Sequence, residues 1–300
     1  HPVAHSFPTR RSSDLVHTVS PSYAQEIQQP SRKPVFYGGE GLEADIADAA
    51  KEGRLTGILN GCEYPPEASV RRPGFFDLLD LFRSRTIRWS GAGEPLAASQ
   101  FIAYARLTEL GRRSDALETL LTAVSRVGEQ KLLLLRESGT DGKSGLAAVL
   151  EALGPDGCFV LLGTGDRDYE QFLASMSARH ANFVFLNGYS DACARALYAA
   201  GDLFLMPSSF EPCGLGQMLA MRDGQPCLVH GVGGLKDTVR HHHNGFVFQG
   251  QTLESQVDQL AATLQNALKL KREKPDRWRK ICANAAATRF RWSDLVEVYL

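Results

Sequence analysis

The sequence predicts an α/β fold built on a doubly wound, parallel, Rossmann-like sheet, and two observations support this. From residue 120 onward, short apolar runs alternate with longer segments of helical composition. The apolar runs are nearly continuous, as in LLTAV at 120–124, and do not alternate with polar residues. Such strands are buried on both faces, which requires helices on both sides of a parallel sheet.

Six strands are expected, and each is a short apolar run followed by a turn-forming or polar residue. They lie at 120–124, 158–162, 183–186, 202–206, 226–230 and 246–248. Because ligands of such sheets bind outside the carboxyl ends of the strands, the loops after the first five should line one crevice. These loops begin at Ser125, Gly163, Gly188, Pro207 and Gly231.

The segments between the strands predict helices. We expect a long helical stretch that ends at 153, and further helices at 169–180, 191–200, 214–222 and 235–241. The segment 191–200 is the clearest, because it is rich in alanine, the strongest helix former. The tail 252–300 is also helical by composition, with a break at Pro275, which cannot continue a helix.

The chain before residue 115 is less regular. Residues 6–15 read SFPTRRSSDL, which resembles a translated sequencing adapter, so we interpret residues 1–15 as non-native. They lack the apolar stretch of a secretion signal. Residues 67–97 have mixed charge, no clean period and a Gly-Ala-Gly loop, and we interpret them as an insertion or linker.

The composition argues against several classes of function. The 33 Lys and Arg residues nearly balance the 34 Asp and Glu residues, so no large basic field is expected to attract nucleic acid or an anionic membrane. No apolar run approaches the ~20 residues of a membrane span. The six cysteines are scattered without a CxxC pair, which fits a reducing cytoplasm better than disulfides or zinc. We therefore expect a cytoplasmic protein without metal or cofactor.

The segment PSSFEPCGL at 207–215 gives the strongest indication of function. Glu211 precedes Pro212, which restricts it to extended conformations and so holds its carboxylate in one direction. Gly214 lets a ligand approach the free N–H groups at a helix start, where a diphosphate binds readily. The alternative is an ordinary strand-to-helix loop with a solvated glutamate.

Arg126 and Lys131 lie in SRVGEQK at 125–131, after another expected strand. On this placement both cations share a rim with Glu211. Two cations facing a helix N-terminus would neutralise a departing diphosphate, and one preorganised donor contributes about 3 to 4 kcal/mol to lowering the barrier. The alternative is a solvated, charged loop.

Gly233 and Gly234 repeat the pattern of strand, glycine turn and helix, and adjacent glycines permit close approach of a ligand to the backbone. Other motifs are incomplete. The run GTG at 163–165 lacks the third glycine of a dinucleotide fingerprint, and GKS at 142–144 lacks the first glycine of a P-loop. Three consecutive histidines at 241–243 fit a solvated helix end better than a metal site.

Several segments, taken together, resemble the C-terminal domain of bacterial glycogen synthases and plant starch synthases, in the same order and at similar spacing. These segments are VSRVGEQK, GTGD, NGYSD, GDLFLMPSSFEPCGLGQ and GVGGLKDTV. Upstream, VSPSYAQEI at 19–27, GEGL at 39–42 and GILNG at 57–61 are similar to segments of the same family, as is FRWS at 290–293. The resemblance spans about residues 16–300, apart from 64–97.

The resemblance implies a GT-B fold, in which two Rossmann-like domains face a cleft. Residues 16–66 would be the C-terminal remnant of a partial N-terminal, acceptor-side domain, and 67–97 a linker. Residues 98–275 would form an essentially complete nucleotide-sugar-binding domain. Residues 276–300 would be a helix that crosses back to the N-terminal domain.

The implied reaction transfers glucose from ADP-glucose to the 4-hydroxyl end of an α-1,4-glucan, with retention of configuration and without metal. By match to the family's motifs, Arg126 and Lys131 would bind the diphosphate and Glu211 would contact the glucosyl unit. The other substrate-binding residues implied in this way are Asn60, Tyr189, Cys213, Gly214, Leu215, Gly233, Gly234 and Thr238.

Two alternatives stay open. The family's Lys-Thr-Gly-Gly loop, catalytic histidine and aspartate have no counterpart here, so we expect an N-terminally truncated chain that is inactive alone. It could then be a nucleotide-binding module without turnover. A GT-B enzyme that uses UDP-glucose is the second alternative, although such enzymes usually carry a second glutamate where Leu219 stands.

Overall fold

The computed structural model describes residues 15–64, 72–91, 98–113 and 117–299. A six-stranded parallel sheet forms the centre of the molecule, in the order β5-β4-β3-β6-β7-β8. Its strands are β3 (Thr119–Val124), β4 (Gly157–Gly163), β5 (Phe183–Asn187), β6 (Leu203–Met206), β7 (Cys227–His230) and β8 (Gly245–Phe248). In chain order this is the 3-2-1-4-5-6 arrangement of a Rossmann fold, which confirms the predicted fold class. The strand order reverses between β3 and β6.

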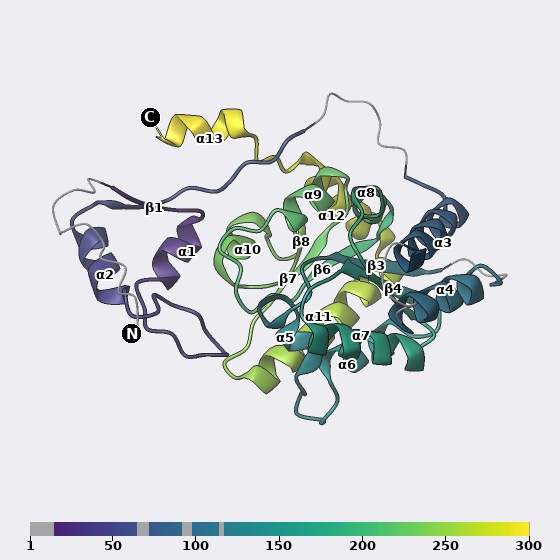
Figure 1. The fold of residues 1–300 in the computed structure, drawn as a ribbon. Helices are drawn as coiled ribbons and strands as arrows, with labels where there is room; N and C mark the ends of the chain where they lie inside the picture. The colour runs from purple at the N-terminus through teal and green to yellow at the C-terminus, as the bar shows by residue number, and fades with distance from the viewer. Residues whose placement is uncertain (1–14, 65–71, 92–97, 114–116, 300) are drawn as a thin grey trace.

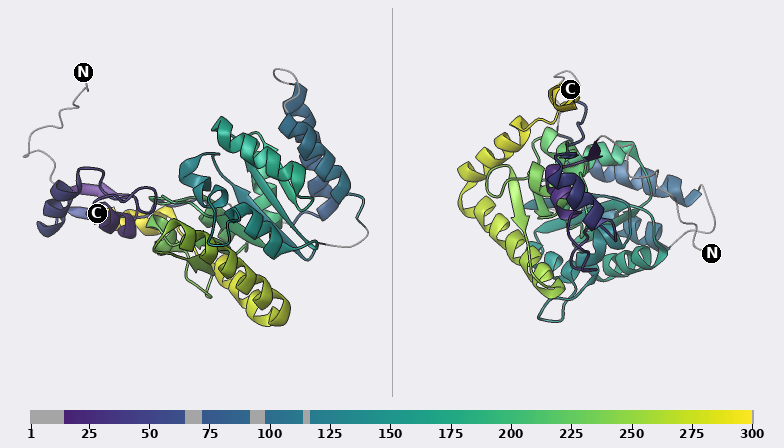
Figure 2. Two further views of the ribbon diagram at one scale, coloured as in Figure 1. Left: turned by 90° about the horizontal axis from the view of Figure 1, so that it is seen from below. Right: turned by 90° about the vertical axis from the view of Figure 1, so that its left-hand side faces the viewer.

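Helices cover both faces of this sheet (Figure 1, Figure 2). The helices that follow β3 are α5 (Glu129–Arg136), α6 (Gly145–Leu153), α7 (Arg167–Arg179), α8 (Asp191–Ala200), α9 (Gly216–Arg222), α10 (Gly233–Thr238), α11 (Leu253–Glu273), α12 (Pro275–Ala287) and α13 (Trp292–Tyr299). One core lies between the sheet and α6, α7 and α11, and a second lies on the side of α8. Phe159 and Leu161 of β4 point into the first core, and Val160 and Leu162 into the second. This is why the strand sequences are continuously apolar.

The single long helix expected up to residue 153 is wrong. The structure has two helices, α5 and α6, because the chain between them turns back on itself. Ser138 and Ser144 form an antiparallel bridge, and Gly142 adopts a φ of +77° that favours glycine. Ser144 then caps α6 by accepting a hydrogen bond from the backbone N–H of Ala147. The helix expected at 235–241 also differs, since α10 begins at Gly233 and ends at Thr238.

Residues 67–97, which we interpret from the sequence as an insertion or linker, contain a regular helix over most of their described length. Residues 75–91 form the helix α3 (Phe75–Gly91), which packs beside α4 (Ala98–Leu110). Leu78, Leu79 and Phe82 of α3 are buried in the core on the α8 side, together with Leu107 of α4. The helical spacing of these apolar residues was present in the sequence, but charged residues between them obscured it. Residues 67–71 and 92–97 lie outside the described part of the chain.

Residues 15–64 form a small separate layer beside α10 (Figure 1). It contains β1 (Val16–Thr18), α1 (Pro21–Glu26), α2 (Glu43–Lys51) and β2 (Leu55–Gly57), with β1 and β2 paired in parallel. The end of the chain returns to it, because the backbone N–H of Cys62 donates to Phe290 O at 2.8 Å and the Tyr64 hydroxyl accepts from Phe290 N at 2.9 Å. The interpretation of residues 1–15 as non-native concerns a segment of which only Leu15 is described.

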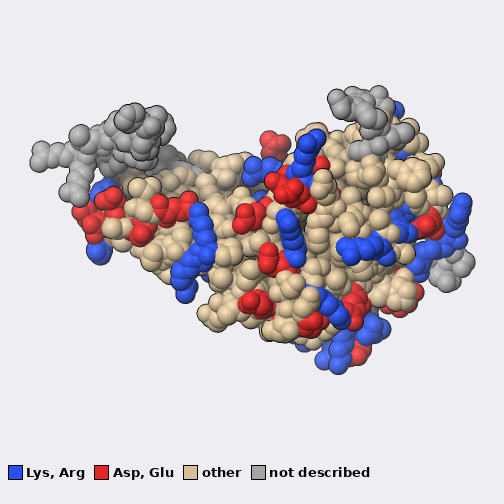
Figure 3. All heavy atoms as spheres, turned by 60° about the horizontal axis from the view of Figure 1, so that its bottom comes forward, with Lys and Arg blue, Asp and Glu red and all other residues tan. Residues whose placement is uncertain are grey.

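The surface carries both signs of charge in close alternation. In Figure 3, basic and acidic side chains are interspersed over the face shown, which agrees with the formal net charge of −1. Within the described residues, none of the helices combines the length and the apolar composition needed to cross a membrane.

Candidate functional site

The candidate site lies where the strand order reverses. β3 and β6 are neighbours in the sheet, and the loops that leave their carboxyl ends run side by side. Gln130 joins these loops, since its carbonyl accepts from the Ser209 backbone N–H at 3.0 Å and its side-chain amide donates to Phe210 O at 3.2 Å. In open α/β sheets this crevice is the usual position for a ligand.

Glu211 and Lys131 form an ion pair in this crevice. Their side chains are only 7% and 17% exposed, so the pair is largely removed from water. The Ser208 hydroxyl donates a further hydrogen bond to Glu211 Oε2 at 3.2 Å. The sequence placed Glu211 and Lys131 on one rim but did not predict that each would be the other's partner.

Arg126 differs from Lys131, although both follow β3. Its side chain is exposed and makes no hydrogen bond or ion pair with any other described residue. A guanidinium in this state keeps all five donors available for an anion. The chain after β3 therefore carries one open cation, Arg126, and a second, Lys131, that is paired with the Glu211 carboxylate.

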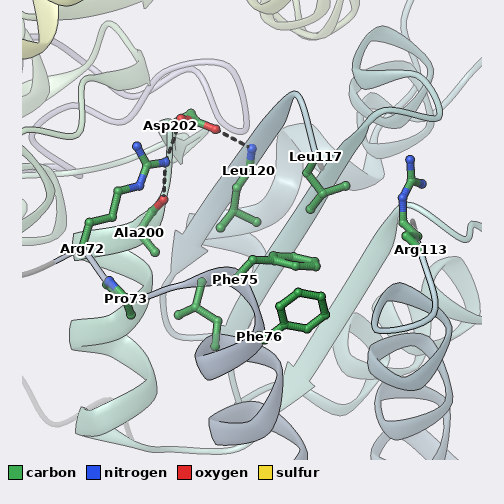
Figure 4. Close-up of a pocket in the computed structure, with 10 residues that line it drawn as sticks. Arg72, Pro73, Phe75, Phe76, Arg113, Leu117, Leu120, Ala200 and Asp202 are labelled. Carbon is green, nitrogen blue, oxygen red and sulfur yellow. Dashed lines mark hydrogen bonds and ion pairs between the residues drawn. The ribbon is translucent and has the colours of Figure 1, made fainter. Parts of the chain in front are cut away.

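A cavity of about 150 Å³ lies between these loops. Residues that line it include Ser125, Lys131, Ser208, Glu211, Gly214 and Leu215. A larger cavity of about 310 Å³ lies at the opposite edge of the sheet, where β3 and β6 begin. Figure 4 shows that Asp202 there bonds both Arg72 and the backbone N–H of Leu120. None of the residues predicted for the site lines this larger cavity.

Residues 213–215 carry the loop into α9. Gly214 has a φ of +77°, and a Cβ there would lie 2.5 Å from Gln217 Oε1, so glycine is required. The Gln217 side-chain amide holds the turn by donating to Cys213 O and Gly214 O, both at 3.0 Å. Cys213 is buried, whereas Leu215 is 48% exposed at the mouth of the loop.

Asn60 brings the small N-terminal layer to the same loop. Its backbone N–H hydrogen-bonds the Cys213 thiol, while burial raises the pKa of that thiol. Cys62 packs with Cys213 and Met218 in one apolar cluster. The structure thus places the GILNG segment next to the FEPCG segment.

Tyr189 follows β5, on the same edge of the sheet but further from Glu211. It is 77% exposed, and its hydroxyl donates to Asp191 Oδ1 at 2.7 Å, which raises the pKa of Tyr189. The Trp89 indole N–H of α3 donates to the Tyr189 carbonyl at 3.3 Å. An exposed aromatic ring held in this way offers a stacking surface.

Gly233, Gly234 and Thr238 are buried and already bonded within the protein. The Gly233 N–H donates to the Glu26 carboxylate, and the Gly234 N–H donates to Glu211 O at 3.0 Å. The Thr238 hydroxyl donates to Gly234 O at 2.8 Å and accepts from Gln217 at 3.2 Å. In this structure the three residues support the loop of Glu211, and their donors are already bonded within the protein.

The described residues also bear on metal binding. Across the described residues, no group of three or more His, Cys, Asp and Glu side chains is placed to hold a metal ion. All six cysteines are free, and five are buried. Of the three consecutive histidines, His241 uses Nδ1 to accept from the Val247 backbone N–H at 3.0 Å. The false P-loop residue Lys143 lies on the surface and pairs with Glu151 at 2.6 Å.

Sequence reasoning missed three supporting residues: Glu26, Gln130 and Ser208. Ser208 and Gln130 lie inside the motifs already singled out, so a strand-end placement of those motifs could have found them. Glu26 lies 207 residues before its partner Gly233, and no local pattern indicates that contact. Its only signal is its position in the segment VSPSYAQEI.

Comparison with known proteins agrees with this geometry. Residues 100–268 match the family model described as glycosyl transferases group 1. The chain is 35% identical over 292 residues to a glycogen synthase of Moorella thermoacetica, covering 94% of this chain and 52% of that protein. It is 36% identical over 300 residues to a glycogen synthase of Marinobacter nauticus, covering 96% of this chain and 53% of that protein.

Among solved structures, the catalytic domain of starch synthase IV from Arabidopsis thaliana, bound to ADP and acarbose, superposes with a TM-score of 0.65 at 25% identity. This match covers 95% of the present chain and 54% of the other. The chain spans about half the length of the curated relatives it matches. Because the family model covers more than half of the chain and the strand order agrees with a GT-B domain, the protein belongs to the group 1 glycosyl transferases.

Proposed function

We propose that this chain is the nucleotide-sugar-binding part of a glucosyltransferase that transfers glucose from ADP-glucose to the 4-hydroxyl end of an α-1,4-glucan. The observation that carries the proposal is the buried Lys131–Glu211 pair at the reversal of strand order, with the exposed Arg126 on the same loop after β3 as Lys131. Relatives named glycogen synthase and a neighbour solved with ADP support the choice of glucan and of adenine.

In this proposal Arg126 and Lys131 bind the diphosphate and stabilise its charge as it leaves. That charge grows in the transition state, so fixed cations lower the barrier more than they tighten ground-state binding. Lys131 is ion-paired with Glu211, and through this pair it couples the carboxylate to the leaving group. Glu211 contacts the glucosyl unit beside the reacting carbon, and no second carboxylate of the kind found in retaining glycosidases is needed.

The remaining contacts follow from position. The backbone at Cys213, Gly214 and Leu215 meets the phosphates, Tyr189 packs near the adenine, and Asn60 reaches the sugar from the N-terminal layer. A leaving phosphate oxygen on the same face accepts the proton of the attacking glucan hydroxyl.

Calorimetry on the 300-residue chain tests the proposal. ADP should bind, and Arg126→Ala should weaken that binding at least about tenfold, since a charge-assisted contact to phosphate is worth ~1.5 kcal/mol or more. Lys143→Ala is the matched control and should change nothing, because Lys143 is occupied by Glu151 on the surface. Absence of ADP binding at millimolar concentration by a folded chain, or tighter binding of UDP than of ADP, would contradict the proposal.

A further inference from the structure

Glu26 is a buried carboxylate at the end of α1, and none of the proposed contacts with the donor uses it. The residue is 7% exposed. Both of its carboxylate oxygens accept from the Gly233 backbone N–H at 3.0 Å, and Oε1 also accepts from Lys236 Nζ at 3.0 Å. A carboxylate removed from water in this way needs such partners, and so its position is closely defined.

The Gly233 backbone packs against the backbone carbonyl of Glu211. It has a φ of +43°, and a Cβ on Gly233 would lie 2.1 Å from Glu211 O. The neighbouring Gly234 N–H donates to that same carbonyl at 3.0 Å. The two glycines are therefore in close contact with the Glu211 peptide, and a shift of Gly233 moves Glu211.

α1 also contacts the residues on either side of Glu211. The Ser20 hydroxyl donates to Pro212 O at 2.5 Å. The Tyr23 ring meets the Phe210 ring edge-on, with centroids 5.6 Å apart. One side of α1 thus supports three points around the carboxylate, namely residues 210, 212 and 233.

We propose that Glu26 is a positioning residue for Glu211, acting through the Gly233–Gly234 turn without touching the donor. The role of Glu211 toward the glucosyl unit rests on the proposed function, whereas the support of its backbone by Glu26 does not. Loss of Glu26 should therefore loosen Glu211 and affect the glucosyl part of the donor more than the diphosphate, which Arg126 contacts.

The decisive variant is Glu26→Gln, which keeps the size of the side chain but removes the charge opposite Lys236 and one acceptor for Gly233. Hydrogen exchange at the Gly234 amide should become about tenfold faster, because its bond to Glu211 O opens more often. Calorimetry should show ADP-glucose binding weakened about fivefold and ADP binding changed less than twofold, the scale of one charge-assisted hydrogen bond. Glu26→Asp, which keeps the charge on a shorter side chain, should give an intermediate result in both measurements.

Two control variants distinguish this positioning role from a general loss of stability in the N-terminal layer. Glu43 of α2 likewise accepts from a glycine, the Gly41 N–H at 2.7 Å, but it lies on a different helix, so Glu43→Gln should alter neither measurement. Ser22→Ala removes a 2.7 Å bond to Asp237 between α1 and α10 and leaves Gly233 untouched. It should leave the ratio of ADP-glucose to ADP affinity unchanged.

The outcomes are distinct. Unchanged exchange at Gly234 in Glu26→Gln, or equal weakening of ADP and ADP-glucose, would overturn the positioning role. If the unmodified chain binds neither ligand while Glu26→Gln still speeds exchange at Gly234, the proposed function fails and the support of Glu211 by Glu26 stands.

Discussion

At the scale of single residues, the Lys131–Glu211 ion pair affects both the stability of the fold and the proposed reaction. Breaking a buried ion pair from one side leaves the other charge without a partner, which costs more than the pair itself contributes. Arg126 has no such partner among the described residues, so its loss should leave the fold unaffected. Arg126 and Lys131, which have the same predicted role, should therefore contribute differently to the free energy of unfolding.

Lys131→Ala should lower the free energy of unfolding by about 2 kcal/mol, somewhat less than for a fully buried pair because Lys131 is 17% exposed. Urea unfolding measures this. The double variant Lys131→Met with Glu211→Gln should recover most of the loss, since no buried charge remains. Equal stability of Lys131→Ala and Arg126→Ala would contradict the account of the pair.

His230 gives the chain a sensitivity to acid. It is buried at the end of β7, its Nδ1 lies 3.0 Å from Ser208 O, and its ring stacks on Phe248. Burial lowers the pKa of His230 to about 4, from an ordinary value of 6.5. Between pH 6.5 and 4, His230 therefore binds a proton in the unfolded chain but stays neutral in the folded chain. Stability is kept above that window and falls as the pH drops through it.

The free energy of unfolding should fall by about 2 kcal/mol between pH 7 and pH 5 on account of His230 alone. In His230→Asn, which retains a side-chain N–H for Ser208 O, this contribution should disappear. Urea titrations of both proteins at the two pH values make the comparison. The same pH dependence in both would show that His230 is not the source.

At the scale of elements, local patterns sufficed for the sheet. Continuous apolar runs predicted the strands β3 to β8, because the side chains on both faces of the sheet are buried in hydrophobic clusters. Local patterns predicted the bounds of the helices less accurately. The turn at Gly142 and the cap at Ser144 divide one apparent helix into α5 and α6, and the apolar spacing of α3 was obscured by its arginines and aspartates.

Contacts between elements that are far apart in the chain could not be predicted from local sequence patterns. The Pro212 and Gly214 signals identified the loop of Glu211, but the pairing with Lys131 joins residues 80 apart in the chain. That pairing depends on β6 lying next to β3, which follows from the order of the strands. The contact of Glu26 with Gly233 spans a still larger separation and depends on how α1 packs against α10.

At the scale of the whole molecule, α3 bears on where the nucleotide-sugar-binding domain begins, which the sequence predicts to be residue 98. We propose that this domain includes α3, whose Leu78 and Phe82 are buried against the sheet. A domain that begins at residue 98 would lack Leu78 and Phe82, which are part of its hydrophobic core. The layer of residues 16–64 and the returning segment near Phe290 then form the second part.

A chain of residues 72–300 should therefore fold, whereas one of residues 98–300 should be less stable by several kcal/mol, since removal of one large buried side chain such as Phe82 costs ~3 kcal/mol or more. Thermal unfolding followed by circular dichroism distinguishes them. Equal melting temperatures would contradict the inclusion of α3 and support the interpretation of 67–97 as a linker.

The buried cysteines have a practical consequence for chemical labelling. Maleimides and similar reagents attack the thiolate, and burial raises the pKa of Cys158 to about 12 and of the half-buried Cys282 to about 11. These two thiols should then react slowly at neutral pH, and Cys62, Cys193, Cys213 and Cys227 are buried, which limits the access of a reagent. A cysteine introduced at an exposed surface position would accept a fluorophore selectively, without removal of any native cysteine. Distance changes between the N-terminal layer and the sheet could then be followed in otherwise unaltered protein.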